Sequence, residues 1–157
     1  MFEPFQIENM LFFDIETAGT VENYEELSTK MQELWSARAE ILRNQLSSKY
    51  PDNKDKTDEE LFKMKSALHA EFGRVVCVSF GKVKFIEGVH TAQIISYYGS
   101  DEVDILEKSF KLMNALSKTG VKPVGHNIKR FDVPYLCKRA FINSIEPANV
   151  LQVWDKK

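Results

Sequence analysis

Two acidic residues follow an apolar run near the start of the chain, in the segment Met10-Leu-Phe-Phe-Asp-Ile-Glu-Thr17. The run from Met10 to Phe13 predicts a buried strand with the acids at its carboxyl end. Because residues i and i+2 of a strand point to the same face, Asp14 and Glu16 are expected to project together. Neighbouring carboxylates resist joint ionisation unless a cation lies between them, and such oxygen ligands suit Mg²⁺ or Mn²⁺. A solvated strand end with two surface acids is the simpler alternative.

A third carboxylate, Asp132, ends a second segment far along the chain, Gly125-His-Asn-Ile-Lys-Arg-Phe-Asp132. Residues 122–126 predict a short strand leading into this segment. Residues 131–141 predict a helix, in which Pro134 must lie in the first turn. From its position alone, Asp132 is equally well explained as a helix N-terminal acid that complements the helix dipole.

The elements that must position these carboxylates follow from the periodicity of the chain. Residues 21–70 are charged and helical in pattern and predict a helical insert after the first strand, in which Thr57-Asp-Glu-Glu60 has the form of a capping box. Residues 74–80 predict a strand, and a further strand or a hairpin pair is expected around Gly88. Asp101 is expected to cap a helix that ends near Lys118. This order predicts an α/β or α+β layer fold with a mixed sheet flanked by helices.

The composition bounds the function more weakly. The chain has 157 residues, 43% of them hydrophobic, and a formal net charge of −2, which predicts a single globular domain over residues 1–157. This charge argues against a protein whose affinity rests on a broad basic surface, but metal ions can supply the charge that faces a phosphate in a nuclease. Cys77 and Cys137 are expected to be small core residues. No apolar stretch reaches the roughly 18 residues of a membrane span, and a cytoplasmic setting is expected.

Two motifs in order, Phe13-Asp-Ile-Glu-Thr17 and His126-Asn-x-x-x-Phe-Asp132, resemble the first and second motifs of the DEDD-type 3′–5′ exonucleases, which have an RNase H-like fold. The chain is most similar to the proofreading exonuclease domains of family B DNA polymerases and to predicted stand-alone bacterial relatives of them. The resemblance runs from Met10 to Phe141. It implies an α/β, RNase H-like mixed sheet in which the helical insert is typical only of some relatives.

The resemblance also implies an activity: hydrolysis of the terminal phosphodiester of single-stranded nucleic acid, with DNA favoured, to nucleoside 5′-monophosphates. Partners would be the 3′ end of the strand and replication or repair proteins. Two Mg²⁺ or Mn²⁺ ions about 3.5–4 Å apart stabilise the attacking and leaving oxygens in such enzymes. By resemblance, Asp14 would bridge both ions, Glu16 would bind the ion on the nucleophile side, and Asp132 would hold the second ion.

Three further residues would contact the terminal nucleotide by resemblance. Phe131 would stack on a base, Asn127 would bond near the carboxylates, and Thr17 would contact the 3′ end. Ordinary core packing is an equally good explanation of Phe131. His126 precedes the second motif and is expected to be structural rather than a general base. Four basic side chains could meet phosphates, although exposed helical charges are more often merely solvated: Lys129, Arg130, Lys138 and Arg139.

The chain departs from the family pattern after Phe141, where the third motif and its fourth carboxylate are expected. Asp155 is a poor substitute because it lies next to the terminus. The C-terminal part of the fold is therefore expected to be absent, and this chain to be weak or inactive. A non-catalytic nucleic-acid-binding or assembly module on the same scaffold is the alternative. A Rossmann or flavodoxin-type nucleotide site is disfavoured, since the turn at residues 16–19 lacks a glycine-rich phosphate cradle.

Overall fold

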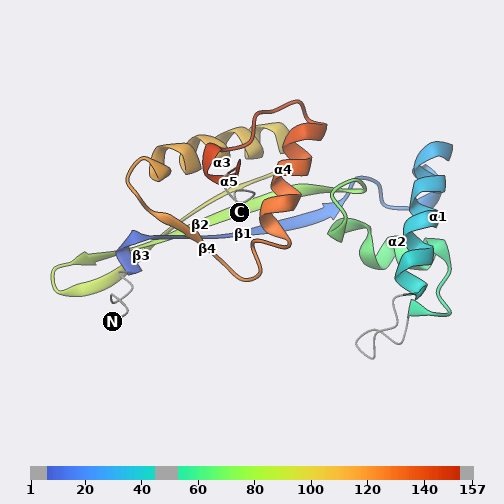
Figure 1. Ribbon diagram of the computed structural model, residues 1–157, viewed down its shortest axis with the longest axis horizontal. Coiled ribbons are helices and arrows are strands. Elements are labelled where there is room, and N and C mark those ends of the chain that lie inside the picture. The colour runs from blue at the N-terminus through green and yellow to red at the C-terminus, as the bar shows by residue number, and fades with distance from the viewer. Residues whose placement is uncertain (1–6, 45–52, 153–157) are drawn as a thin grey trace. The chain divides into compact units, whose positions relative to one another are not determined.

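The computed structural model describes residues 7–44 and 53–152, and these fall into two units (Figure 1). Residues 18–74 make one compact unit, here called the helical unit. The described residues on either side of that range make the other, the sheet unit. The insert expected at residues 21–70 lies within the helical unit.

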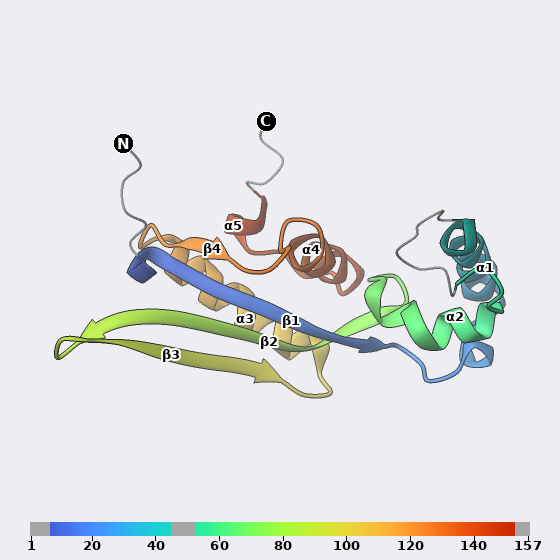
Figure 2. The ribbon, with the colours of Figure 1, turned by 90° about the horizontal axis from the view of Figure 1, so that it is seen from below.

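Four strands form a mixed sheet, in the order β3-β2-β1-β4. The strands are β1 (Met10–Gly19), β2 (Gly73–Ile86), β3 (Val89–Tyr98) and β4 (Lys122–Val124). β4 runs parallel to β1, with Phe12 opposite Val124, whereas β2 and β3 are antiparallel (Figure 2). The prediction of an α/β fold with a mixed sheet flanked by helices is confirmed.

β1 does not end where the apolar run ends. The strand continues to Gly19, so Asp14 and Glu16 lie inside it and not at its carboxyl end. The continuation has a simple cause, because the sequence goes on alternating: Ile15 is buried like Phe13, while the two acids are exposed. Side chains on one face of the strand therefore enter the core, and those on the other face meet solvent.

β2 is also longer than expected, because Gly81 does not interrupt it. β2 and β3 form one long hairpin in which Val78 pairs with Tyr97 and Ile86 with Val89. The turn between them is made by Glu87 and Gly88, with φ values of 51° and 83°. Positive φ at both central residues is the geometry that a two-residue hairpin turn demands, and glycine adopts it without steric cost.

Helices α3 (Glu102–Ser117), α4 (Asp132–Ile142) and α5 (Asn149–Gln152) lie to one side of the sheet (Figures 1 and 2). Asp101 caps α3 by accepting a hydrogen bond from the Asp104 amide at 3.1 Å, as predicted. α4 begins at Asp132, which places Pro134 in the first turn, also as predicted. α5 is a single turn that was not predicted from the sequence.

A buried ion pair joins α3 to α4. The Arg139 guanidinium donates to both carboxylate oxygens of Glu102, at 2.8 and 2.5 Å, and the Val75 amide and the Asn143 side chain donate to the same carboxylate. Burial alone would raise the pKa of Glu102, but the hydrogen bonds from Arg139, Val75 and Asn143 hold this pKa below its ordinary value. The spacing of apolar residues predicts Val103 on the buried stripe of this helix, but Glu102 takes the inward position at the start of α3 and Val103 is exposed.

The helical unit contains α1 (Thr29–Asn44), α2 (Asp58–Lys65) and its own aromatic core. The Trp35 ring is fully buried and lies 5.1 Å from Phe62 and 5.0 Å from Phe72, centroid to centroid. α2 opens with the predicted capping box, in which Thr57 and Glu60 each bond the other's backbone amide. The sequence predicts a helix that runs from this box towards Glu71, but α2 ends at Lys65, where residues 66–68 tighten into a 3₁₀ turn.

Asp58 fastens α1 to the start of α2. Its carboxylate accepts hydrogen bonds from Ser36 and, at 2.7 Å, from Arg43, while its carbonyl accepts from the Trp35 indole at 2.8 Å. Burial would raise the pKa of Asp58, yet the bonds from Ser36 and Arg43 lower it. Pro51, which the sequence predicts to end the helical pattern that begins near Val21, lies outside the described residues.

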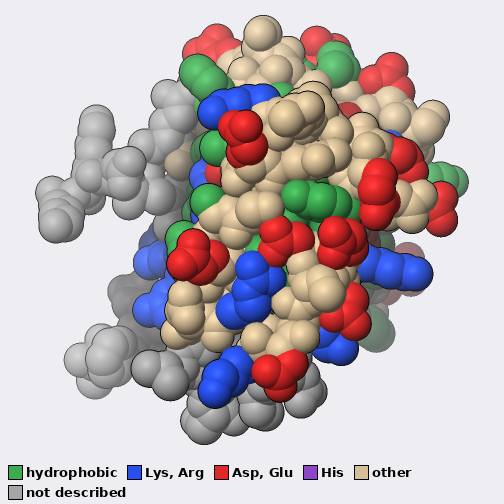
Figure 3. Space-filling view, turned by 90° about the vertical axis from the view of Figure 1, so that its right-hand side faces the viewer, with side chains coloured by type: hydrophobic (Ala, Val, Ile, Leu, Met, Phe, Trp, Pro, Cys, Tyr) green, Lys and Arg blue, Asp and Glu red, His purple; other side chains and the backbone are tan. Residues whose placement is uncertain are grey.

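Figure 3 shows that basic and acidic side chains are intermixed on the face seen there, with few hydrophobic side chains between them. This face therefore offers no broad basic surface for a polyanion. Among residues 7–44 and 53–152, no helix is both long and apolar enough to cross a membrane.

Candidate functional site

The two acids of the first segment project from the middle of β1. Asp14 and Glu16 are exposed on the same strand face, and Ile15 between them is buried on the opposite face. Phe12, two residues before Asp14, lies half-buried on the carboxylate face. Alternation along the strand thus presents an aromatic ring and two carboxylates in a row.

Asp132 is brought against β1 by the segment that follows β4. β4 ends at Val124 beside Phe12. Residues 125–131 form the loop that connects β4 to α4, and α4 begins next to Ile15. The Ile15 amide donates a hydrogen bond to Asp132 Oδ1 at 3.3 Å, across 117 residues of sequence. The two motifs, far apart in the chain, therefore meet at the edge of β1 that β4 leaves free.

The connecting loop is pressed closely onto β1 at Gly125. A methyl group at this position would lie 2.5 Å from the Phe13 carbonyl oxygen and would also overlap the Ile128 side chain. Asn127 turns the loop with φ of +56°, a conformation that Asn tolerates better than most residues, and its carbonyl accepts from the Arg130 and Phe131 amides. Glycine at 125 and asparagine at 127 thus set where α4 begins.

The electrostatics link Asp132 to Asp14. Asp132 is only 2% exposed. Burial raises the pKa of its carboxyl group, the negative charge of Asp14 raises this pKa further, and the Ile15 amide and the His126 side chain oppose the rise. The two aspartates are therefore close enough to repel one another, and a cation between them would relieve that repulsion.

The carboxylate oxygens of this site suit a divalent metal ion, but the side chains do not gather into a complete metal-binding group. Asp14 and Asp132 interact, and Glu16 shares the strand face of Asp14. Within the described ranges, however, no three His, Cys, Asp or Glu side chains gather closely enough to form a metal-binding group. The two aspartates would hold such an ion, with Glu16 as the third available ligand.

A groove of about 430 Å³ runs beside Asp14 on the open face of the sheet. Its lining includes Phe12 and Asp14 from β1, Ser79 and Gly81 from β2, and His126. His126 is exposed and lines this groove, a position that the expectation of a structural role did not include. Its place directly after the strand that pairs with β1 was the available signal.

The three residues expected to contact substrate are placed differently. Asn127 is exposed and lines a second hollow with Lys129 and Arg130. Phe131 is half-buried, and its ring centroid lies 5.5 Å from that of Tyr135, so the ring packs against Tyr135 and stays partly exposed. Thr17 is half-buried and, by alternation along β1, belongs to the face opposite the carboxylates. The structure does not bring the Thr17 side chain to the acids.

The expectation is wrong for one of the basic residues that were considered for phosphate binding. Arg139 is neither a phosphate ligand nor a solvated charge, because it is 6% exposed and pairs with Glu102. Lys129, Arg130 and Lys138 are exposed. The cysteines also differ from expectation: Cys77 and Cys137 are half-buried rather than core residues, and burial raises the pKa of the Cys137 thiol.

Asp155, weighed as a fourth carboxylate, lies outside the described residues. Comparisons of the chain with protein-family models, with curated proteins and with solved structures find no match.

Proposed function

We propose that the sheet unit is a metal-dependent phosphodiesterase of RNase H-like type that removes nucleotides from the 3′ end of single-stranded nucleic acid, with DNA as the favoured substrate. The observation that carries the proposal is the meeting of the two motifs. Ile15 bonds Asp132 across 117 residues, and the charge of Asp14 is felt at the Asp132 carboxyl. Carboxylates that converge from separate segments and repel one another are the usual sign of a cation site.

In this proposal, Asp14 and Asp132 hold the cation pair and Glu16 completes the ligand set. Bound Mg²⁺ or Mn²⁺ supplies an activated water and stabilises the charge on the leaving oxygen. The chain's own contribution is to fix the ligands. The Ile15 amide orients the Asp132 carboxylate, and β1 holds Asp14 and Glu16 on one face. A positioned donor set of this kind lowers the cost of assembling the transition state.

The groove beside Asp14 supports a single-stranded substrate. It is lined by Phe12, and the half-exposed Phe131 ring lies just before Asp132, so aromatic surface is available for base stacking. Lys129 and Arg130 line the adjoining hollow and would meet the phosphates. Aromatic stacking and phosphate contacts are tolerant of sequence, as a terminal exonuclease requires.

Turnover is proposed to be weak in this chain. No metal-binding group of three acidic, His or Cys ligands is assembled in the part of the chain that the structure describes, and the resemblance calls for a fourth carboxylate. Fewer ligands leave the cations loosely held and the attacking water poorly oriented.

An end-labelled single strand incubated with Mn²⁺ tests the proposal. A 5′-labelled oligonucleotide should shorten stepwise from its 3′ end, and a 3′-phosphorylated strand should resist. Asp14→Ala should reduce the rate by about a thousandfold, since metal stabilisation of the transition state is worth several kcal/mol and each 1.4 kcal/mol is tenfold. Glu107→Ala, which removes an exposed carboxylate on α3, is the matched control. Cleavage that survives Asp14→Ala would refute the proposed site.

One observation favours a second candidate, a non-catalytic nucleic-acid-binding or assembly module. The hairpin strand β3 exposes large apolar side chains, with Ile94 75% and Tyr98 78% exposed. Exposed apolar surface of this kind marks an interaction site. If the protein binds single-stranded nucleic acid in Mn²⁺ without cleaving it, and Asp14→Ala does not change this binding, the second candidate is favoured over the first.

A further inference from the structure

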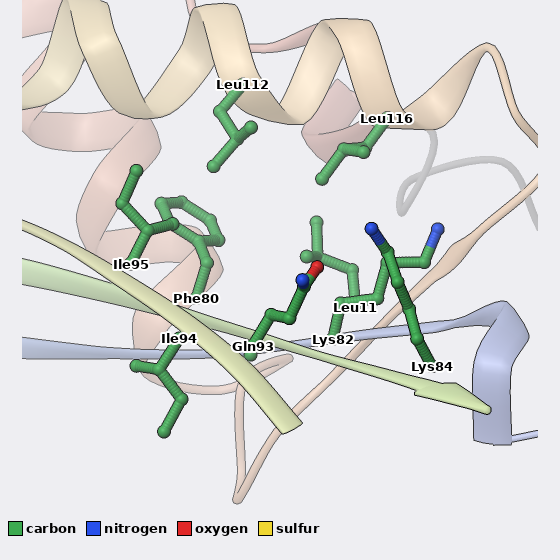
Figure 4. A pocket seen from close by; sticks show the side chains of 10 residues that line it. Leu11, Phe80, Lys82, Lys84, Gln93, Ile94, Ile95, Leu112 and Leu116 are labelled. Atoms are coloured by element: carbon green, nitrogen blue, oxygen red, sulfur yellow. The ribbon is translucent and has the colours of Figure 1, made fainter. Parts of the chain in front are cut away.

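A second cavity, of about 320 Å³, lies between the β2–β3 hairpin and α3 (Figure 4). Its apolar walls come from strands and helix together: Leu11, Phe80, Ile95, Leu112 and Leu116. Leu11 belongs to the buried face of β1, the face opposite Asp14 and Glu16, so this cavity lies on the other face of β1 from the carboxylate groove, although Phe80, Gly81 and Ile94 of the hairpin border both. Its volume falls within the range of small-molecule sites, about 300–1,000 Å³.

Three polar side chains stand at the mouth of this apolar cavity. Lys82 and Lys84 lie two residues apart on β2 and so share a face, and Gln93 is paired directly opposite Lys82. Figure 4 shows both lysine side chains rising from the sheet toward α3, with the Gln93 amide beside them. In the described structure neither lysine side chain makes a hydrogen bond or an ion pair with another residue. Two like charges are thus held side by side, a repulsion that an anion would relieve.

Neither helix capping nor ion pairing with nearby residues explains the two lysines. The last carbonyls of α3 are already occupied: Leu116 accepts from the Thr119 amide and hydroxyl at 2.9 and 2.7 Å, and Ser117 accepts from the Gly120 amide at 3.1 Å. The lysines therefore do not serve as caps of that helix. Acidic partners are scarce in sequence as well, because residues 108–131 contain no Asp or Glu.

We propose that this cavity, here called the lysine pocket, binds a compact organic anion. The apolar or aromatic body of the ligand packs between Phe80 and Leu116, and its phosphate or carboxylate group lies against the Lys82 and Lys84 ammonium groups, with the Gln93 amide as a further donor. Charge complementarity selects the anion, and the apolar walls select against a bare inorganic ion. The site is independent of the nuclease proposed for the other face of β1.

Titration with 2-naphthyl phosphate, followed by amide chemical shifts, tests the lysine pocket. Shifts should concentrate at residues 80–84, 93–95 and 112–116. The neutral analogue 2-naphthol and inorganic phosphate should each bind about tenfold or more weakly, since each lacks one half of the interaction. The double substitution Lys82→Met and Lys84→Met should weaken the binding of 2-naphthyl phosphate by a similar factor. The corresponding double arginine substitution should retain binding. Lys111→Met, which removes an exposed lysine of α3, should have no effect.

Three results would overturn the proposal. Equal affinity for 2-naphthol would mean that the cavity is merely apolar and the lysines merely solvated. Equal affinity for inorganic phosphate would mean a surface charge patch without a pocket. Unchanged binding by the double methionine variant, with its thermal midpoint preserved to show that it is folded, would remove the lysines from the site.

Discussion

At the scale of single residues, the strongest physical statement concerns Asp132, a buried carboxylate beside another carboxylate. Its pKa is raised by burial and by the negative charge of Asp14, so the folded protein binds a proton at this carboxyl group more tightly than the unfolded chain does. A group of this kind contributes stability that is present below its unfolded pKa and is lost as the pH rises through its folded pKa. Above its folded pKa the ionised Asp132 is therefore a cost to the fold, as is common for functional residues.

Replacing this carboxylate by an amide should therefore stabilise the protein. Asp132→Asn keeps an oxygen acceptor for the Ile15 amide but removes the charge. We expect a gain of about 1 kcal/mol at pH 7, or roughly 2–4 °C in the thermal midpoint, which disappears in acid. Thermal unfolding followed by circular dichroism at several pH values measures it. A variant that is less stable than the parent at pH 7 would contradict the assignment of Asp132 as an unfavourable charge.

Gly125 is the second residue with a specific requirement. In Gly125→Ala the new methyl group would press on the Phe13 carbonyl and on Ile128, which should cost about 1–3 kcal/mol and displace Asp132 from β1. Gly81→Ala is the matched control, because its methyl group would meet the Phe12 side chain at an ordinary 3.6 Å. Chemical denaturation of both variants gives the difference. Equal stability of the two would show that the loop does not rest on β1 as described.

At the scale of elements, local signals predicted where two of the helices begin. Asp101 and the Thr57–Glu60 box marked two helix starts because caps depend on a few adjacent residues. The length of β1 was underestimated, because an apolar run indicates a strand but does not show where its half-exposed continuation ends. Arg139 could not be assigned from sequence, since its partner Glu102 lies 37 residues away on another helix.

The Glu102–Arg139 pair leads to a prediction about how α3 and α4 are held together. Arg139→Met leaves the Glu102 carboxylate buried without its cation and should cost about 3–5 kcal/mol. The double variant Glu102→Gln with Arg139→Met removes both charges and should recover much of this loss. Unfolding in denaturant measures all three proteins, and Lys111→Met serves as the control for loss of a positive charge. A loss of less than about 1 kcal/mol in the free energy of unfolding of the single variant would mean that the pair behaves like a solvent-exposed ion pair.

At the scale of the whole molecule, the division into two units has a measurable consequence. The core of the helical unit is built on Trp35, which contacts the rings of Phe62 and Phe72. Trp35→Ala should cost this unit about 3–5 kcal/mol. Amide hydrogen exchange should then speed up in α1 and α2, while β1 and α4 keep their protection. Equal loss of protection throughout would show that the two units unfold as one.

At this scale, part of the fold and of the candidate site could be predicted from the sequence and part could not. The order of strands and helices was sufficient to predict an α/β fold with a mixed sheet flanked by helices. Sequence could not predict which ligands close around a cation, because that depends on side-chain directions and on the register between β1 and the Gly125 loop. Thr17 illustrates this limit, since its motif position suggested substrate contact while strand alternation turns it to the other face.

The central claim is that Asp14, Glu16 and Asp132 form a divalent cation site, and calorimetric titration with Mn²⁺ tests it most directly. The parent chain should bind Mn²⁺ with a measurable heat, and Asp14→Asn and Asp132→Asn should each abolish it, while Glu107→Gln should bind as the parent does. Equal binding by the parent and by both aspartate variants, or no binding by a parent chain shown to be folded, would contradict the account.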